Sequence, residues 1–253
     1  MKAPSDANRC IGRMSSTSVS APLSDPPCPD DSHGDPILEL EGLYHRWKGP
    51  KPPVLDDVSL TLRAGHVTWI GGRNGVGKTT LLRLAAGILL PQRGSVRLGE
   101  LTPQSKGNLF RRQIGFLSAG DRGLQARMKV TQQLDYWARL AYVPRSRRAA
   151  LVTGSLQRFA LEEFAGRRVD RMSMGQRQRI RLAMAFLHEP RVLLLDEPRN
   201  SLDDDGYRLL NEQIEQAARR GATVLWCSPR GEDRVVTCDA SYTLTDGHLE
   251  RVL

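Results

Sequence analysis

The stretch Gly71–Thr80 reads GGRNGVGKTT and comes directly after the apolar run HVTWI, residues 66–70. Its segment 72–79 fits the pattern G-x-x-x-x-G-K-[ST]. Glycines at this spacing let successive backbone N–H groups turn inward around phosphates, and a following helix adds the positive end of its dipole. The run TTLLRLAAGILL, residues 79–90, predicts that helix, which we expect Pro91 to end. The sequence therefore predicts a phosphate-binding loop between a strand and a helix.

Every residue of this loop is a candidate nucleotide ligand. Lys78 is long enough to reach the terminal phosphates, which also makes it a candidate catalytic residue, and the Thr79 hydroxyl can bind Mg²⁺. The predicted ligands are Gly72, Arg73, Asn74, Gly75, Val76, Gly77, Lys78, Thr79 and Thr80.

A second chemical element is the run VLLLDEP, residues 192–198. Branched apolar residues predict a buried strand, which carries Asp196 and Glu197 to the carboxyl edge of the sheet, where ligands of open α/β sheets bind. Asp196 suits a Mg²⁺ ligand, and Glu197 is the candidate catalytic residue that polarises an attacking water.

Strand and helix patterns alternate along the chain and predict an α/β fold with a mostly parallel sheet. Strands are expected at ILELEGLYHRW, VSLTLRAG, HVTWI, QIGFL, RVLLLDEP and ATVLWC. The section of about 107–170 looks helical and basic, and GYRLLNEQIEQAARR reads as an amphipathic helix with Leu210, Ile214 and Ala217 on one face.

Composition narrows the function class. Lys and Arg number 37 against 28 acids, a net charge of +9 that favours anionic partners. Residues 1–36 are rich in Pro and Ser without Phe, Tyr or Trp, and we expect a disordered tail. The sequence has no apolar run long enough to span a bilayer and no secretory signal pattern. The four cysteines form no C-x-x-C pair, so neither a zinc site nor a disulfide framework is expected.

A third motif points to a family. RMSMGQRQRIRLAMAFLHEP places Ser173, Gly175 and Gln176 ahead of a helix with an apolar face of Ile180, Ala183, Met184 and Leu187. The segment resembles the signature of ABC ATPases, Leu-Ser-Gly-Gly-Gln, and the order of motifs agrees over residues of about 37–250. RNSLDDDG resembles the family's dimer-contact loop, with Ser201, Leu202 and Asp203 at its core. Trp47 falls where the family places an aromatic that stacks on adenine, with Tyr44 as a second candidate.

The resemblance implies a P-loop NTPase core with an N-terminal antiparallel β portion and a small helical subdomain. It implies ATP and Mg²⁺ as ligands and a head-to-tail homodimer or heterodimer. There the loop at Gly72–Thr80 of one subunit and Ser173, Gly175 and Gln176 of the other hold one ATP. It also implies a separate transmembrane permease, a cytoplasmic place on the inner face of the membrane, and no nucleic acid.

The sequence departs from the family pattern twice. A glutamine is usual after the strand QIGFL, whereas Ala119 stands there, with Ser118 or Asp121 as substitute metal ligands. A histidine is usual after the strand ATVLWC, whereas the chain has Ser228-Pro229-Arg230. Arg230 could supply a positive charge to the γ-phosphate, as arginine does elsewhere in phosphoryl transfer.

Three functions stay open at this point. The chain resembles most the compact subunits of exporters, and the basic residues Arg111, Arg112, Arg122 and Arg127 would face the permease or an acidic leaflet. A soluble ABC protein acting on nucleic acid would suit the net charge of +9. A subunit that binds ATP with little hydrolysis would suit the missing glutamine and histidine.

Overall fold

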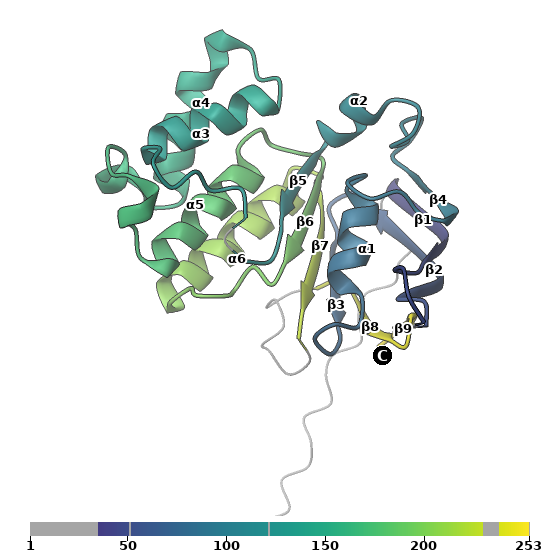
Figure 1. The fold of residues 1–253 in the computed structure, drawn as a ribbon. Coiled ribbons are helices and arrows are strands. Elements are labelled where there is room, and N and C mark those ends of the chain that lie inside the picture. Colours follow the sequence, from purple (N-terminus) through teal and green to yellow (C-terminus); the bar gives the residue numbers. More distant parts are fainter. Residues whose placement is uncertain (1–34, 51, 121, 230–237, 253) are drawn as a thin grey trace, which may run out of the picture.

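The computed structural model describes residues 35–50, 52–120, 122–229 and 238–252, and its chain is arranged in layers (Figure 1). A six-stranded sheet lies at the centre, with a small antiparallel sheet and one helix on one side and the remaining long helices on the other. The predicted tail lies outside the described residues up to position 34, and the first strand begins at Pro36, one residue before the predicted start.

The central sheet has the order β5-β6-β7-β3-β8-β9. All neighbouring strands in it run parallel except β8 and β9, which are antiparallel. Its strands are β3 (Val67–Gly71), β5 (Ile114–Leu117), β6 (Val192–Asp196), β7 (Thr223–Ser228), β8 (Ala240–Thr245) and β9 (His248–Arg251). Strands β3, β6 and β7 are buried at every position, as expected for parallel strands covered on both faces. The predicted α/β class is confirmed.

The small sheet is fully antiparallel, with the order β2-β1-β4. It consists of β1 (Pro36–His45), β2 (Leu55–Arg63) and β4 (Arg93–Arg97). Buried and more exposed residues alternate along β2, so one face of this sheet joins the core. That face packs on helix α1 (Lys78–Ala85), which in turn covers the central sheet through an apolar cluster that includes Leu81, Leu82 and Leu194.

Helix α1 ends earlier than predicted. The sequence pattern extended it to Pro91, but its last residue is Ala85. Gly87 adopts a left-handed φ of 63° that breaks the helical path, and the amides of Ile88 and Leu89 turn back to the Arg83 carbonyl. A side chain at Gly87 would also press on Pro103 and Phe110. Helix C-termini commonly use such a glycine, and here it acts before the proline.

The other helices are α2 (Gly107–Arg111), α3 (Val130–Leu140), α4 (Arg145–Arg158), α5 (Met174–Phe186) and α6 (Asp204–Arg219), with short 3-10 turns at Glu162–Phe164 and Val169–Arg171. Helices α5 and α6 cover the second face of the central sheet, and α3 and α4 pack outside α5 (Figure 1). Strand β5, predicted from the run QIGFL, lies inside the section of about 107–170 that otherwise looked helical, and it pairs with β6 in the central sheet. The subdomain boundaries stay a prediction.

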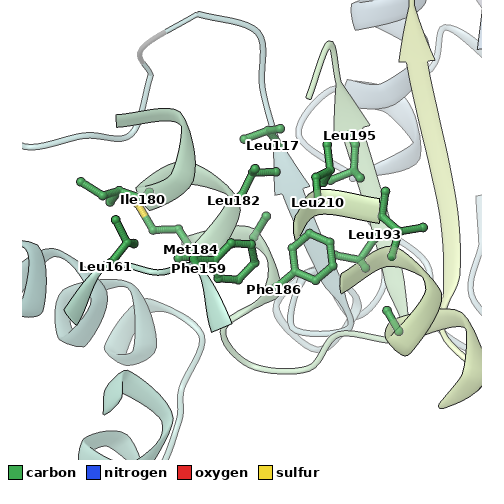
Figure 2. Packing of buried hydrophobic residues seen from close by; sticks show 14 of the residues in the cluster. Leu117, Phe159, Leu161, Ile180, Leu182, Met184, Phe186, Leu193, Leu195 and Leu210 are labelled. Carbon is green, nitrogen blue, oxygen red and sulfur yellow. The ribbon is translucent and has the colours of Figure 1, made fainter. Parts of the chain in front are cut away.

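The second core cluster joins α5 to this sheet, as Figure 2 shows. The predicted apolar face of α5 is buried, with Ile180, Ala183 and Leu187 fully so and Met184 nearly so. The apolar face predicted for α6, Leu210, Ile214 and Ala217, is buried as well. Burial of this extent holds α5 firmly against the central sheet. Among the described residues, no helix is long and apolar enough to cross a membrane.

Candidate nucleotide site

The site lies at the carboxyl ends of β3 and β6, where α1 begins. A pocket of about 500 Å³ opens there. Its lining residues come from four segments of the chain: Trp47, Lys48, Val54, Asn74, Gly75, Gly77, Lys78, Thr79, Thr80 and Glu197. Seven of the predicted ligands and the predicted catalytic glutamate therefore share one cavity. Lys48 and Val54 are lining residues that the sequence analysis did not single out.

Glycines shape the loop that leads into α1. A Cβ added to Gly77 would lie 2.7 Å from the Val54 carbonyl oxygen, and one added to Gly72 would lie 2.8 Å from the Leu244 carbonyl oxygen. Gly75 and Gly77 take φ values of 81° and 122°, which disfavour any larger residue. Only glycine allows this close backbone path, and the resulting cradle of N–H groups at a helix N-terminus fits a phosphate chain.

Lys78 is 95% buried, and its ammonium group is held by its own loop. Lys78 Nζ donates to the carbonyl oxygens of Gly72 at 2.6 Å and of Arg73 at 3.1 Å. These bonds offset the loss of hydration of the buried ammonium group and hold that group beside the glycine cradle. Arg73 is exposed, and the predicted ligands Gly72, Arg73 and Val76 are not among the residues that line the pocket.

Thr79 and Asp196 bring two oxygen ligands together. The Thr79 hydroxyl donates to Asp196 Oδ2 at 2.7 Å, and the Ala119 amide donates to the same oxygen at 3.4 Å. Burial raises the pKa of Asp196, and the hydrogen bonds from Thr79 and Ala119 oppose that shift. A hydroxyl and a carboxylate at this distance fit Mg²⁺, which binds few protein oxygens and completes its shell with water and nucleotide phosphates.

Glu197 follows Asp196 directly and has a strained backbone, with a φ of 49°. Its amide donates to the Cys227 carbonyl at 2.8 Å, which anchors the turn to β7. The side-chain amide of Asn200 donates through Nδ2 to Glu197 Oε2 at 2.7 Å and so orients the carboxylate. The sequence analysis missed Asn200, and no signal in the pattern pointed to it, because its role depends on this local turn.

Trp47 lines the pocket and is 47% exposed, so one part of its ring faces solvent. Its ring packs edge-on against His45, with centroids 4.8 Å apart and planes at 80°. His45 is buried beneath it, and burial lowers the pKa of its imidazole. Tyr44, the second candidate for stacking on a base, instead lies under Arg93 and outside the pocket lining.

The predicted signature residues lie at the start of α5 and outside this pocket. Ser173 and Gln176 form a reciprocal cap: the Gln176 amide donates to Ser173 Oγ at 3.2 Å, and the Ser173 amide donates to Gln176 Oε1 at 3.0 Å. A Cβ at Gly175 would lie 2.9 Å from the Ser201 carbonyl oxygen, so a glycine brings this turn close to the predicted dimer-contact loop. One chain therefore does not bring Ser173, Gly175 and Gln176 to its own Lys78.

Comparisons with known proteins identify the family of the chain. The family model described as ABC transporter matches residues 55–200. The chain belongs to the ABC transporter family. It is 34% identical over 215 residues to the ABC transporter ATP-binding protein NatA of Bacillus subtilis, covering 84% of this chain and 87% of that protein. It is 32% identical over 235 residues to the nickel import ATP-binding protein NikO of Rhodobacter capsulatus, covering 86% and 91%.

Solved structures agree on the fold. A dimeric structure of a bacterial ABC transporter cassette matches with a TM-score of 0.76 at 22% identity, covering 85% of this chain and 97% of that one. The family match and the curated relatives make the chain an ATP-binding subunit of the ABC transporter kind.

At both positions where this ABC subunit departs from the family pattern, the structure shows which contacts the local residues make. At the first, Ala119 reaches Asp196 through its backbone amide, since its methyl side chain has no polar atom. At the second, Ser228 is buried and its hydroxyl accepts a bond from Trp69 Nε1 at 2.8 Å, which holds the strand end just before Pro229. Asp121 and Arg230, the proposed substitutes, lie outside the described residues.

Replacing Trp47 with alanine is expected to weaken ATP binding about tenfold, because stacking of a base on an aromatic ring contributes about 1–3 kcal/mol. Binding of inorganic triphosphate should stay within about twofold, since the glycine cradle does not include Trp47. Isothermal titration with both ligands measures the two effects, and Trp47→Phe, which keeps a ring, is the control. An equal loss for ATP and triphosphate would contradict a role in base recognition.

Proposed function

We propose that this ABC subunit hydrolyses ATP at the pocket of Lys78, Thr79, Asp196 and Glu197 and so drives export through a separate membrane permease. The observation that carries the proposal is the position of Glu197. Its carboxylate lines the same cavity as Lys78 and Thr79 and is held by Asn200 at 2.7 Å. A carboxylate fixed beside a phosphate cradle is suited to orient a water and accept its proton.

The residues divide the chemistry between them. Lys78 and the backbone amides of the glycine loop would neutralise the phosphates, as donors that need little rearrangement. Thr79 and Asp196 would hold Mg²⁺, which when bound would stabilise negative charge on the phosphates. Glu197 would act as general base, and Trp47 would hold the adenine. All of these groups come from one chain.

The site is completed by a second subunit in this proposal. Ser173 and Gly175 lie outside the pocket of their own chain, at an exposed helix N-terminus, which is itself a phosphate-binding device. In a head-to-tail pair, this helix end would meet the γ-phosphate held by Lys78 of the other subunit. Closure of the two subunits would then depend on the γ-phosphate, and hydrolysis would let the subunits separate.

A groove of about 300 Å³ between α2 and the end of α3 is the proposed permease-binding surface. It is lined by Asn108, Arg111, Arg112, Ile114, Trp137, Leu140, Ala141, Tyr142 and His188. Leu140 and Tyr142 are 51% and 59% exposed, and the Arg112 guanidinium lies over the Tyr142 ring. Exposed apolar side chains rimmed by arginines fit an amphipathic permease segment with acidic residues. The subunit would then lie on the inner face of the membrane.

The double variant Leu140→Ser with Tyr142→Ser is expected to reduce co-purification of the permease at least about tenfold, because a few apolar side chains that become buried on binding carry most of an interface's free energy. ATP binding should be unchanged, since neither residue lines the nucleotide pocket. The exposed change Gln216→Ser on α6 is the control. Retention of the permease by the double variant would contradict this surface.

A role on nucleic acid is the competing interpretation that the net charge of +9 supports. Native purification in mild detergent separates the two, because a transporter subunit brings down a polytopic membrane protein and a nucleic-acid ATPase brings down RNA or DNA. Export itself is proposed from the likeness to compact exporter subunits. Cells without the chain should then accumulate the cargo, whereas an importer would leave them depleted of it.

Pro229 supports a second candidate function, a subunit that binds ATP and opens or closes with it but turns it over slowly. Proline has no side-chain donor for the γ-phosphate, and the loop at Ser118–Gly120 offers a methyl group where a glutamine is usual. We propose that these two changes lower the rate of hydrolysis without removing it, because Glu197, Asp196 and Lys78 are retained. Turnover of the Pro229→His variant tests this.

A further inference from the structure

A buried arginine, Arg181, lies in the middle of α5 and joins two other segments. It is 94% buried, and its guanidinium donates through Nη2 to the Ser118 carbonyl and through Nη1 to Gln178 Oε1. Ser118 begins the loop after β5, where the family glutamine is missing. A buried guanidinium has lost its hydration, so breaking its hydrogen bonds would leave a buried charge without partners. These charge-assisted bonds therefore hold the Ser118 carbonyl and the Gln178 side chain firmly in place.

Gln178 extends the connection to the other side of the site. It is 96% buried, and its Nε2 donates to the Pro198 carbonyl at 2.7 Å. Pro198 follows Glu197 directly, and the Ala119 amide next to Ser118 donates to Asp196. Arg181 and Gln178 thus tie the loop after β5 and the turn after β6 to one helix, on both sides of the Asp196–Glu197 pair.

Gln178 and Arg181 lie on the helix whose N-terminus carries the signature residues, so they connect that helix end to the two loops. Helix α5 begins at Met174, next to Ser173, and is packed into the apolar core through Ile180, Leu182 and Met184 (Figure 2). A helix fixed in this way moves as a unit. A shift of its exposed N-terminus would therefore reach Ser118 and Pro198 through buried hydrogen bonds.

We propose that Arg181 is a positioning residue for ATP hydrolysis, which with Gln178 couples the signature end of α5 to Asp196 and Glu197. The inference rests on the proposed function. Arg181 fixes the backbone from which the Ala119 amide reaches Asp196, and Gln178 fixes the strained turn that presents Glu197. In a chain with Ala119 at the usual glutamine position, this buried pair holds in place the loop whose backbone amide reaches Asp196.

The test compares Arg181→Met, Gln178→Leu and the double variant in the complex with its permease. Arg181→Met is expected to lower kcat about tenfold with KM for ATP within about twofold, because partners that orient metal-binding residues typically contribute 10–100-fold to activity. Arg181→Lys keeps the charge, but its one nitrogen cannot replace two, so it should recover part of the loss. The double variant should lose little more than either single one, since both act through one network.

Ile180→Ala is the control for general destabilisation. Ile180 neighbours Arg181 in the chain, is fully buried, and belongs to the apolar cluster rather than to the hydrogen-bonded pair (Figure 2). If Ile180→Ala melts at the same temperature as Arg181→Met, it should still keep kcat within about twofold of the wild type. The substitution lowers the free energy of unfolding through lost packing and leaves the hydrogen bonds of Arg181 in place. A loss of kcat in Ile180→Ala as large as in Arg181→Met would overturn the proposal, and so would fully additive losses in the double variant.

Amide hydrogen exchange separates this inference from the proposed function. In Arg181→Met, the peptide covering residues 117–120 should lose protection, and Gln178→Leu should expose residues 197–200, while β7 exchanges as in the wild type. Absence of turnover in the wild-type complex would remove the proposed function, yet the exchange pattern would still show whether Arg181 holds these segments. Unchanged exchange in Arg181→Met would overturn the coupling whatever the turnover.

Discussion

Replacing Glu197 with glutamine is expected to reduce ATP turnover at least about a hundredfold, because a positioned general base contributes about 10²–10⁴-fold. The substitution keeps an oxygen that can accept the bond from Asn200, so the turn should stay in place while the basic carboxylate is lost. ATP would then persist in the site, and the ATP-bound dimer should accumulate. Phosphate release and size-exclusion chromatography in ATP measure the two effects.

The control for this variant is Glu212→Gln, the same chemical change at an exposed position of α6. It should leave both turnover and oligomeric state as in the wild type. If Glu197→Gln hydrolysed ATP at the wild-type rate, another group would be the base. If it lost turnover without any ATP-dependent dimer, Glu197 would act on the fold of the turn rather than on the chemistry.

Replacing Lys78 with methionine is expected to weaken ATP binding about a hundredfold, since loss of one preorganised cationic donor to a phosphate is comparable to loss of an oxyanion donor, about 10²–10³-fold. The stability of the free protein should change little, because the gain from no longer burying an ammonium group opposes the loss of its bonds to the Gly72 and Arg73 carbonyls. At a ligand concentration of 100 times Kd, ATP adds about 2.7 kcal/mol to the free energy of unfolding of the wild type. The variant should lose most of that gain at the same concentration.

Thermal denaturation with and without ATP measures this difference, and Arg83→Met is the matched control. Arg83 is a basic residue in the last turn of the same helix and does not line the pocket. Its substitution should leave the ATP-dependent rise in melting temperature intact. An undiminished rise in Lys78→Met would show that the nucleotide binds elsewhere.

Local patterns were enough to predict the elements that carry the phosphate loop and the acidic pair. Gly72–Thr80 and Val192–Pro198 combine a continuous apolar strand with a polar turn, and both features are visible without tertiary contacts. The structure confirms the predicted α/β class and the buried faces of α5 and α6. The family match confirms the predicted membership of the ABC family. The roles of the individual site residues stay predictions.

Elements that depend on partners far along the chain were missed. Strand β4 has the sequence RGSVR, which is mostly polar, and it exists because its backbone pairs with β1 about 50 residues earlier. Strands β8 and β9 were likewise not predicted, and the end of α1 was placed too late because the helical pattern continues past Gly87. In each case the deciding interaction is tertiary or depends on one backbone angle.

The same limit explains which site residues escaped the sequence analysis. Asn200, Gln178 and Arg181 are polar residues within motifs already explained by other residues, and nothing in their spacing shows that they bond to Glu197, Pro198 and Ser118. Trp47 could be proposed only through resemblance to the family. Its place in the pocket, unlike that of Tyr44, became visible with the fold.

The most direct test of the account is phosphate release by the wild-type subunit in complex with its permease, with Glu197→Gln as the blank and Pro229→His in parallel. We expect turnover in the wild type that the glutamine change abolishes and that histidine at position 229 raises. Such a result would identify a working ATPase that tolerates proline at this position. Tight ATP binding without turnover in the wild type, and turnover gained only with histidine, would contradict the account and leave a nucleotide-gated subunit whose motor is its partner.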